Sequence, residues 1–150
     1  MNALEQLESL FGSGPPNLAW KLVIPFEADE SREETRRFLY KRNWNSLSAK
    51  EIRNSLAFPI CEIPSMLTPE AFVYFLPAFL RMCEEEPRMV DCLAEATLSC
   101  LIRGLESGEV RADGLSPEQA DCLVGFFRRQ FRYGLFSKDT KRLVQALGRE

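Results

Sequence analysis

A single strongly marked helix near the middle of the chain constrains the fold most. Thr68, Pro69 and Glu70 supply an N-cap, a proline at the first helical position and an acidic residue in the first turn. This start predicts a helix that runs to about Glu86. Its apolar residues wrap most of the helix circumference, which predicts a buried central helix. They are Phe72, Val73, Phe75, Leu76, Phe79, Leu80 and Cys83. Pro77 lies inside the helix and is expected to kink it, because proline removes a backbone hydrogen bond.

Shorter amphipathic helices are predicted on both sides of this one, from apolar residues at three- and four-residue spacing. With the central helix, the predicted helices cover approximately residues 1–11, 31–42, 48–58, 68–86, 87–108, 116–134 and 137–148. Ser31 and Ser48 are the expected caps of the second and third helices. Residues 17–27 are predicted to be mainly loop, and residues 59–64 to be a connector. No segment shows convincing strand alternation. The sequence therefore predicts an all-α protein, a compact single-domain bundle of six or seven helices that spans residues 1–150.

The composition argues against most enzyme classes. Histidine is absent from the 150 residues, which removes the commonest general base and the commonest metal ligand. The sequence contains neither a glycine-rich phosphate loop nor a Gly-x-Ser-x-Gly elbow. Glutamates at 30–34 and 84–86 could in principle bind a cation, but their positions better suit helix-dipole and solvent-exposed roles. We therefore expect no enzyme activity, no cofactor and no metal site.

The cysteines and the chain's hydropathy indicate a cellular compartment. Cys61, Cys83, Cys92, Cys100 and Cys122 are odd in number and lack the two-residue spacing of zinc and redox motifs. We expect free thiols that act as small apolar core residues. The amino terminus lacks a signal-peptide pattern, and no stretch approaches the 18 apolar residues that a membrane helix needs. The expectation is a soluble cytoplasmic protein without a membrane partner.

The net charge of −3 is unevenly distributed. Residues 1–127 carry 12 basic and 20 acidic groups, a net charge of −8, and residues 128–150 carry 7 basic and 2 acidic groups, a net charge of +5. An acidic body has the opposite sign to that expected of a nucleic-acid binder. The charge therefore argues against a nucleic-acid partner and favours a basic protein partner.

One basic and aromatic cluster nevertheless occurs near the carboxy terminus. It contains Phe127, Arg128, Arg129, Phe131, Arg132 and Tyr133. A nucleic-acid site would stack bases on such rings and neutralise phosphates with such cations. The favoured interpretation is an amphipathic helix with its phenylalanines inward and its arginines outward. A nucleic-acid-associated regulator that works through residues 128–142 stays as an alternative, and its binding would weaken at raised salt.

The two tryptophans are also open to two interpretations. Trp20 and Trp44 lie beside polar, turn-like sequence, and tryptophan is enriched at binding hot spots. Core packing is the favoured interpretation of both. Partial exposure stays as the alternative, and Trp44 is kept as a candidate contact on that ground.

A longer motif resembles a known family. Residues 67–80 read LTPEAFVYFLPAFL and are preceded by Arg42, Asn43, Trp44 and Leu47. Together these residues resemble the signature of small bacterial proteins of uncharacterised function, over roughly residues 30–82. The resemblance implies a cytoplasmic bacterial protein and supplies no catalytic residues, and its motif describes a capped, proline-kinked, buried helix. In size, acidity and missing chemistry, the chain is also similar to immunity proteins encoded beside secreted antibacterial toxins.

The expected function is therefore that of an immunity protein, which binds and neutralises the effector domain of a cognate toxin without catalysis. Acidic groups would steer a basic partner, and aromatic anchors would hold it. The candidate contacts are Asp29, Glu30, Glu33, Glu34, Trp44, Glu84, Glu85, Glu86 and Asp91. The alternative is a helical structural or regulatory interaction module without a toxin partner, which could act as a homo-oligomer.

Overall fold

The central helix is the element around which the others are arranged. The computed structural model describes residues 2–25, 29–132 and 136–149. Over these ranges the α-helices are α1 (Ala3–Phe11), α2 (Glu30–Leu39), α3 (Ala49–Ser55), α4 (Ile63–Met66), α5 (Pro69–Glu85), α6 (Leu93–Ser107), α7 (Pro117–Gln130) and α8 (Ser137–Ala146). Short 3₁₀ turns are η1 (Trp44–Ser46), η2 (Ile60–Glu62) and η3 (Ala112–Gly114). The described chain is all-α, as predicted, and its only β feature is an isolated bridge between Val23 and Leu67.

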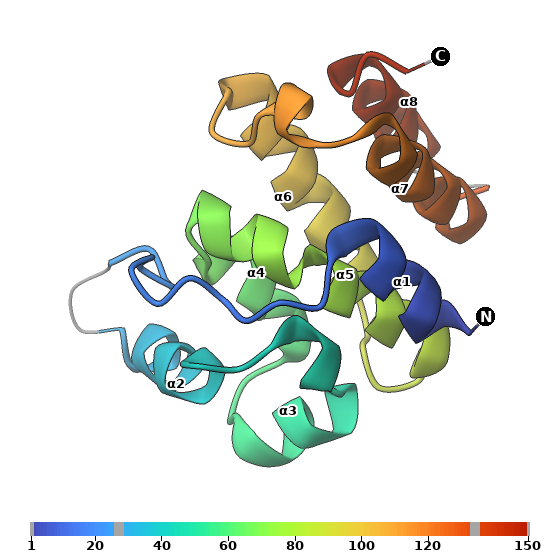
Figure 1. The fold of residues 1–150 in the computed structure, drawn as a ribbon. Coiled ribbons are helices and arrows are strands. Elements are labelled where there is room, and N and C mark those ends of the chain that lie inside the picture. Colours follow the sequence, from blue (N-terminus) through green and yellow to red (C-terminus); the bar gives the residue numbers. More distant parts are fainter. Residues whose placement is uncertain (1, 26–28, 133–135, 150) are drawn as a thin grey trace.

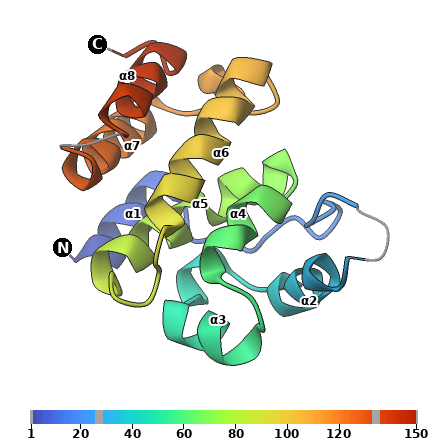
Figure 2. The same ribbon diagram turned by 180° about the vertical axis from the view of Figure 1, so that it is seen from behind.

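Helix α5 begins as the sequence predicts. The Thr68 side chain accepts a hydrogen bond from the Ala71 N–H, and Pro69 occupies the first turn, where its missing N–H costs nothing. Ten of its 17 residues are buried, which confirms the predicted central position. The helix continues through the buried Pro77 to Glu85. Figure 1 and Figure 2, from opposite sides, show α5 between α1 and α6.

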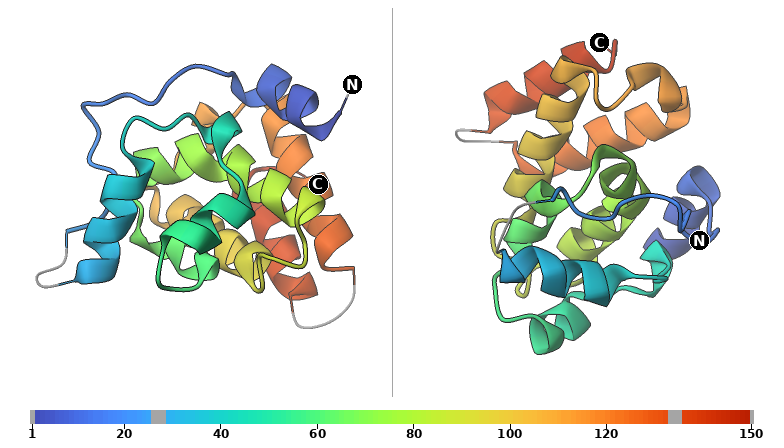
Figure 3. Two further views of the ribbon diagram at one scale, coloured as in Figure 1. Left: turned by 90° about the horizontal axis from the view of Figure 1, so that it is seen from below. Right: turned by 90° about the vertical axis from the view of Figure 1, so that its left-hand side faces the viewer.

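Five of the other helices form two groups around α5. Helices α6, α7 and α8 lie on one side of it, and α2 and α3 lie on the other (Figure 1, Figure 3). Helix α6 packs against both α5 and α8, and α7 packs against α8 and α1. Helix α2 is less firmly attached, because only Thr35 and Leu39 of its residues are buried.

Of the two caps predicted for α2 and α3, Ser31 was wrong and Ser48 is confirmed. The cap of α2 is Asp29 rather than Ser31, because the Asp29 carboxylate accepts the Arg32 N–H at 3.2 Å. Aspartate caps a helix as well as serine does, so the helix starts earlier than predicted. Ser48 caps α3 as predicted, through a 3.1 Å bond from the Glu51 N–H. The Glu51 carboxylate pairs with Arg42 instead of closing a capping box.

Three other boundaries were wrong. The expected connector at 59–64 is helical, because Pro59 caps η2 and Pro64 lies in the first turn of α4, positions that need no N–H. Helix α6 begins at Leu93 and not near residue 87, since Asp91 adopts a left-handed backbone with φ of 47°. Helix α7 starts after Ser116 as predicted but ends at Gln130. Its predicted stop, Gly134, lies outside the described residues.

A hydrogen-bonded node ties the amino-terminal segment to α5. The Trp44 indole N–H donates to the Gly12 carbonyl at 2.8 Å. The Tyr74 hydroxyl donates to the Gly14 carbonyl at 2.9 Å and accepts from the Trp44 backbone N–H at 3.2 Å. Residues of the sequence motif, Trp44 and Tyr74, therefore have a structural role here.

Candidate functional site

The first group of expected contacts lies on α2 and pairs with cations of the same helix. Asp29, which caps the helix, also makes a 2.9 Å ion pair with Arg32. Glu33 pairs with Arg36 at 2.7 Å and with Arg37 at 3.2 Å. The Arg36 hydrogen bond, followed by the charges of Arg36 and Arg37, lowers the pKa of the Glu33 carboxyl to about 2 despite some desolvation. These carboxylates are therefore compensated within the helix.

The other two carboxylates of α2 do not make it an acidic surface. Glu30 is exposed, and Glu34 is half-buried. Residues 29–42 carry four acidic and five basic side chains, so the segment has a net positive charge. A basic partner would find no strong attraction along this helix.

The second group, at the end of α5, pairs mainly with other parts of the chain. Glu84 makes a 2.8 Å ion pair with Arg129 of α7. Glu85 pairs with Arg81, one turn earlier on its own helix, at 3.0 Å. Both pairs are at least partly exposed, so they contribute little to stability, but they reduce the free negative charge of this surface.

The Glu86 side chain binds backbone N–H groups, and Asp91 lies in a turn. The Glu86 carboxylate accepts the N–H groups of Ala49 at 2.9 Å and Lys50 at 3.3 Å, and so binds the first turn of α3. Asp91 is exposed at the turn before α6. Figure 1 and Figure 2 place the α5–α6 connection and α2 on opposite sides of the lower half, so the two groups do not form one surface.

The expectation that Trp44 is a partner contact was wrong. Its side chain is 1% exposed and its indole N–H is hydrogen-bonded within the chain. Trp20 is partly exposed and makes an edge contact with Tyr74 at 6.1 Å between ring centroids. Core packing, the favoured interpretation of both tryptophans, is thus confirmed for Trp44.

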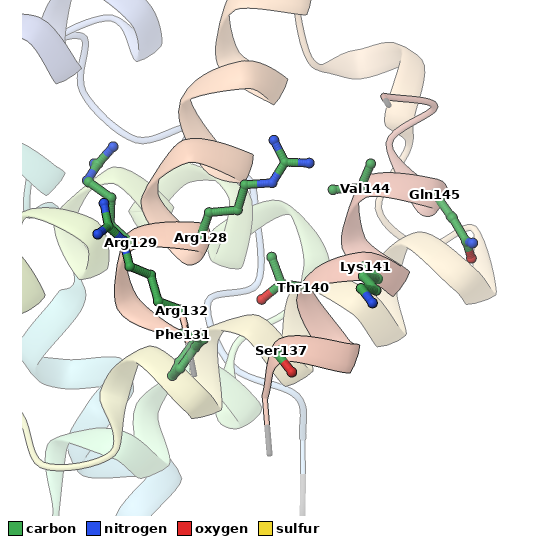
Figure 4. A pocket seen from close by; sticks show the side chains of 9 residues that line it. All are labelled: Arg128, Arg129, Phe131, Arg132, Ser137, Thr140, Lys141, Val144 and Gln145. Carbon is green, nitrogen blue, oxygen red and sulfur yellow. The ribbon is translucent and has the colours of Figure 1, made fainter. Parts of the chain in front are cut away.

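A cleft of about 570 Å³ lies between α7 and α8. It is a better candidate for a binding site than the acidic groups described above. Four cationic side chains line this α7–α8 cleft: Arg128, Arg129, Arg132 and Lys141. Phe131 and Val144 supply apolar surface at its base and are 8% and 9% exposed. Figure 4 shows Arg128 extending from α7 toward the side of the cleft where Val144 lies.

Aromatic packing fixes the two helices that form the cleft. The Phe126 and Phe127 rings meet edge to face at 4.9 Å, and Phe127 stacks with Phe131 at 6.3 Å. Phe131 in turn contacts Phe136, just before α8, at 5.2 Å. Because these rings point inward, the neighbouring arginines project outward, as the sequence predicts. Tyr133, the sixth member of the predicted cluster, lies outside the described residues.

The cations of the cleft are unequally compensated. Arg129 is paired with Glu84 at the rim. Arg128, Arg132 and Lys141 have no ion-pair or hydrogen-bond partner within 2–25, 29–132 and 136–149. The next cation of α8, Arg142, by contrast pairs with Glu106 at 2.6 Å and with Asp139 at 3.4 Å. The described lining of the cleft thus carries three cations without a described ionic partner, together with two apolar side chains.

The polar groups in the described lining of the cleft are cations, hydroxyls and one side-chain amide. No carboxylate, thiol or imidazole is among the described residues that line it. Thr140 donates its hydroxyl hydrogen to the Phe136 carbonyl at 3.1 Å, as a helix residue commonly does. What the cleft offers a ligand is positive charge and apolar contact.

Four of the five cysteines, Cys61, Cys83, Cys100 and Cys122, have a thiol pKa raised mainly by burial. Burial is the main cause that raises the pKa of Cys83 to about 12 and that of Cys61 to about 11. The neighbouring Cys92 also raises the pKa of Cys61, because a hydrogen bond that the Cys61 thiol donates to it is lost when the thiol ionises. All five thiols are free, as predicted, but Cys92 is exposed, so the expectation of core packing was wrong for it. It precedes the first turn of α6, where the chain reverses direction.

Sequence reasoning named the arginines of the cleft, included Lys141 only within the range 128–142 of the nucleic-acid alternative, and did not consider Val144 as a site residue. The available signal was the net charge of +5 over residues 128–150. It could not show which cations share a cleft, because that depends on how α8 packs against α7.

The described residues form neither a metal site nor a membrane-spanning helix. Within the described residues, no group of three acidic or cysteine side chains could hold a metal ion. None of the described helices has both the length and the apolar character to cross a membrane. Comparisons of the chain with protein-family models, curated proteins and solved structures found no match.

Proposed function

We propose that the protein is a non-catalytic binding protein that neutralises a cognate toxin, and that the α7–α8 cleft is its binding surface. The observation that carries this proposal is that Arg128, Arg132 and Lys141, none with a described ionic partner, line one cleft with the apolar Phe131 and Val144. Charge at a cleft steers an oppositely charged partner, and a desolvated apolar centre holds it. The proposal moves the contact surface from the acidic runs to the carboxy-terminal helices.

The rest of the molecule supports binding rather than chemistry. The chain has no histidine, and its thiols with resolved pKa shifts are all held in the protonated form by burial. An inhibitor that acts by binding needs only a complementary surface on a stable scaffold. The all-α core provides such a scaffold.

The test is co-expression with the effector domain encoded by the neighbouring gene. The proposal predicts that the gene of this protein lies directly after one that encodes a larger protein with a variable carboxy-terminal effector domain. We expect the effector domain alone to arrest growth, co-expression of this protein to restore it, and the two to co-purify at moderate salt. An unrelated effector domain, which should not be neutralised, is the control for specificity.

Toxicity without rescue or binding would contradict the proposal. A neighbouring gene with no toxic product would also count against it. Either outcome would favour the alternative, a helical interaction module without a toxin partner.

A further inference from the structure

We infer that the α7–α8 cleft binds an acidic protein segment that carries an aliphatic side chain between its carboxylates. This inference rests on the proposed function and names the chemistry of the partner at its site. Expectations from net charge alone pointed to a basic partner. The local charge of the cleft has the opposite sign to that of the chain and decides what binds there.

Charge complementarity is the first argument for an acidic segment. Arg128, Arg132 and Lys141 line one cleft and lack described partners, so the cleft carries positive charge that the described chain does not compensate. Carboxylates suit this arrangement because guanidinium groups bind them in a planar, two-pronged geometry. The ion pair of Glu84 with Arg129 at 2.8 Å shows a carboxylate bound to one of the arginines that line the cleft.

The apolar base is the second argument. Phe131 and Val144 line the same cleft as the cations, with 8% and 9% of their surface exposed. The cleft volume of about 570 Å³ lies within the range of ordinary ligand sites. A simple inorganic anion would satisfy the cations but leave this apolar surface in contact with water. A peptide with an aliphatic side chain between acidic residues would cover both.

The aromatic rings argue against a nucleic acid at the same place. Binding of single strands requires exposed rings on which bases stack. Phe127 is fully buried, and Phe131 presents only a small part of its surface. Within the described part of α7, the basic helix face therefore lacks a stacking platform.

The experiment is a titration of the complete protein, followed by backbone amide NMR. The probes are the blocked pentapeptide Glu-Glu-Leu-Glu-Glu, its counterparts with lysine for glutamate and with glycine for leucine, inorganic phosphate, and a short single-stranded oligonucleotide. We expect the acidic leucine peptide to shift amides of α7 and α8 and to bind best. The glycine peptide should bind several-fold more weakly, and raised salt should weaken both peptides.

Charge variants connect binding to the cleft. Reversing two cations, Arg132→Glu with Lys141→Glu, should weaken peptide binding by about tenfold or more. Arg53→Glu, an exposed change on α3, is the matched control and should leave the affinity unchanged. Glu84→Gln should strengthen binding several-fold, because it frees Arg129 from its internal partner. The circular dichroism spectrum and melting temperature of each variant show whether it is folded.

Any of the following outcomes would overturn the inference. Tighter binding of the oligonucleotide would assign the cleft to nucleic acid, and phosphate binding equal to that of the peptide would assign it to a simple anion. Peptide binding that survives the double reversal would place the site elsewhere, and the absence of amide shifts would reject the site.

The inference and the proposed function fail separately. A toxin complex that is unaffected by the double reversal would preserve the function and reject the cleft. Peptide binding at the cleft with no toxin to neutralise would preserve the cleft and reject the toxin function.

Discussion

At the scale of residues, the two tryptophans show how similar sequence surroundings lead to different roles. Trp44 is 1% exposed and donates its indole N–H to the Gly12 carbonyl, so it joins segments more than 30 residues apart. Trp20 is only partly buried, and its ring contacts Tyr74 at its edge. Both contacts involve the node that ties the amino-terminal segment to α5, but only Trp44 is fully desolvated.

Replacing Trp44 should therefore weaken folding. We expect Trp44→Phe to lower the free energy of unfolding by about 1–3 kcal/mol, because the Gly12 carbonyl loses its partner and a void replaces part of the ring. The matched control, Trp20→Phe, should cost less than about 1 kcal/mol. Urea unfolding followed by circular dichroism measures both. Equal small losses would show that Trp44 is not the core residue described above.

At the scale of elements, the end of α6 depends on one close approach. An added Cβ at Gly104 would lie 2.5 Å from Cγ2 of the buried Val110. The Val110 N–H also donates to the Gly104 carbonyl at 2.9 Å, so the chain after α6 folds back onto the helix. Valine is branched at Cβ and has little freedom to move aside. Glycine is therefore needed here for space rather than for backbone conformation.

The substitution Gly104→Ala tests this packing. Alanine favours a helix over glycine by about 1 kcal/mol, but overpacking costs about 1–3 kcal/mol. We expect a net loss of stability and a lower melting temperature. Gly125→Ala in α7 is the control, since its added Cβ would meet only the end of the flexible Arg129 side chain, at 3.4 Å. That change should be neutral or stabilising by up to about 1 kcal/mol. A gain for both variants would contradict the close contact.

At the scale of the whole molecule, burial is concentrated on α5 and α6 and falls off toward α2. Phe75 and Leu76 of α5 and Leu98 of α6 are fully buried. Helix α2 is held mainly by two buried residues and by polar contacts such as that of the Thr35 hydroxyl with the Met66 sulfur at 3.4 Å. Regions with few buried apolar contacts open locally before the whole molecule unfolds.

Hydrogen exchange should reveal this gradient. We expect amides in the middle of α5 and α6 to exchange only on global unfolding, and those of α2 to be protected at least about tenfold less. Exchange measured by NMR at increasing denaturant separates local from global opening. Equal protection of α2 and α5 would mean that the molecule opens as one cooperative unit.

The local sequence predicts the caps of three of the eight described α-helices. Thr68 before α5, Ser116 before α7 and Ser48 before α3 all cap as predicted. Each cap is a bond to the backbone three residues later, so the local sequence contains both partners. The buried character of α5 also follows from its own residues, because apolar groups around a whole helix need cover on every side.

The packing of the helices decides which charges are compensated across long stretches of the chain. Glu84 pairs with Arg129, 45 residues away, and Arg142 pairs with Glu106, 36 residues away. Glu86 lies in an acidic run that the sequence predicts to be exposed to solvent, but its carboxylate binds the first turn of α3. By the same packing, Arg128 and Arg132 share a cleft with Lys141 of α8 and lack such partners among the described residues. Electrostatic contacts depend on distance in space, and spacing along the chain does not fix that distance until the helices have packed.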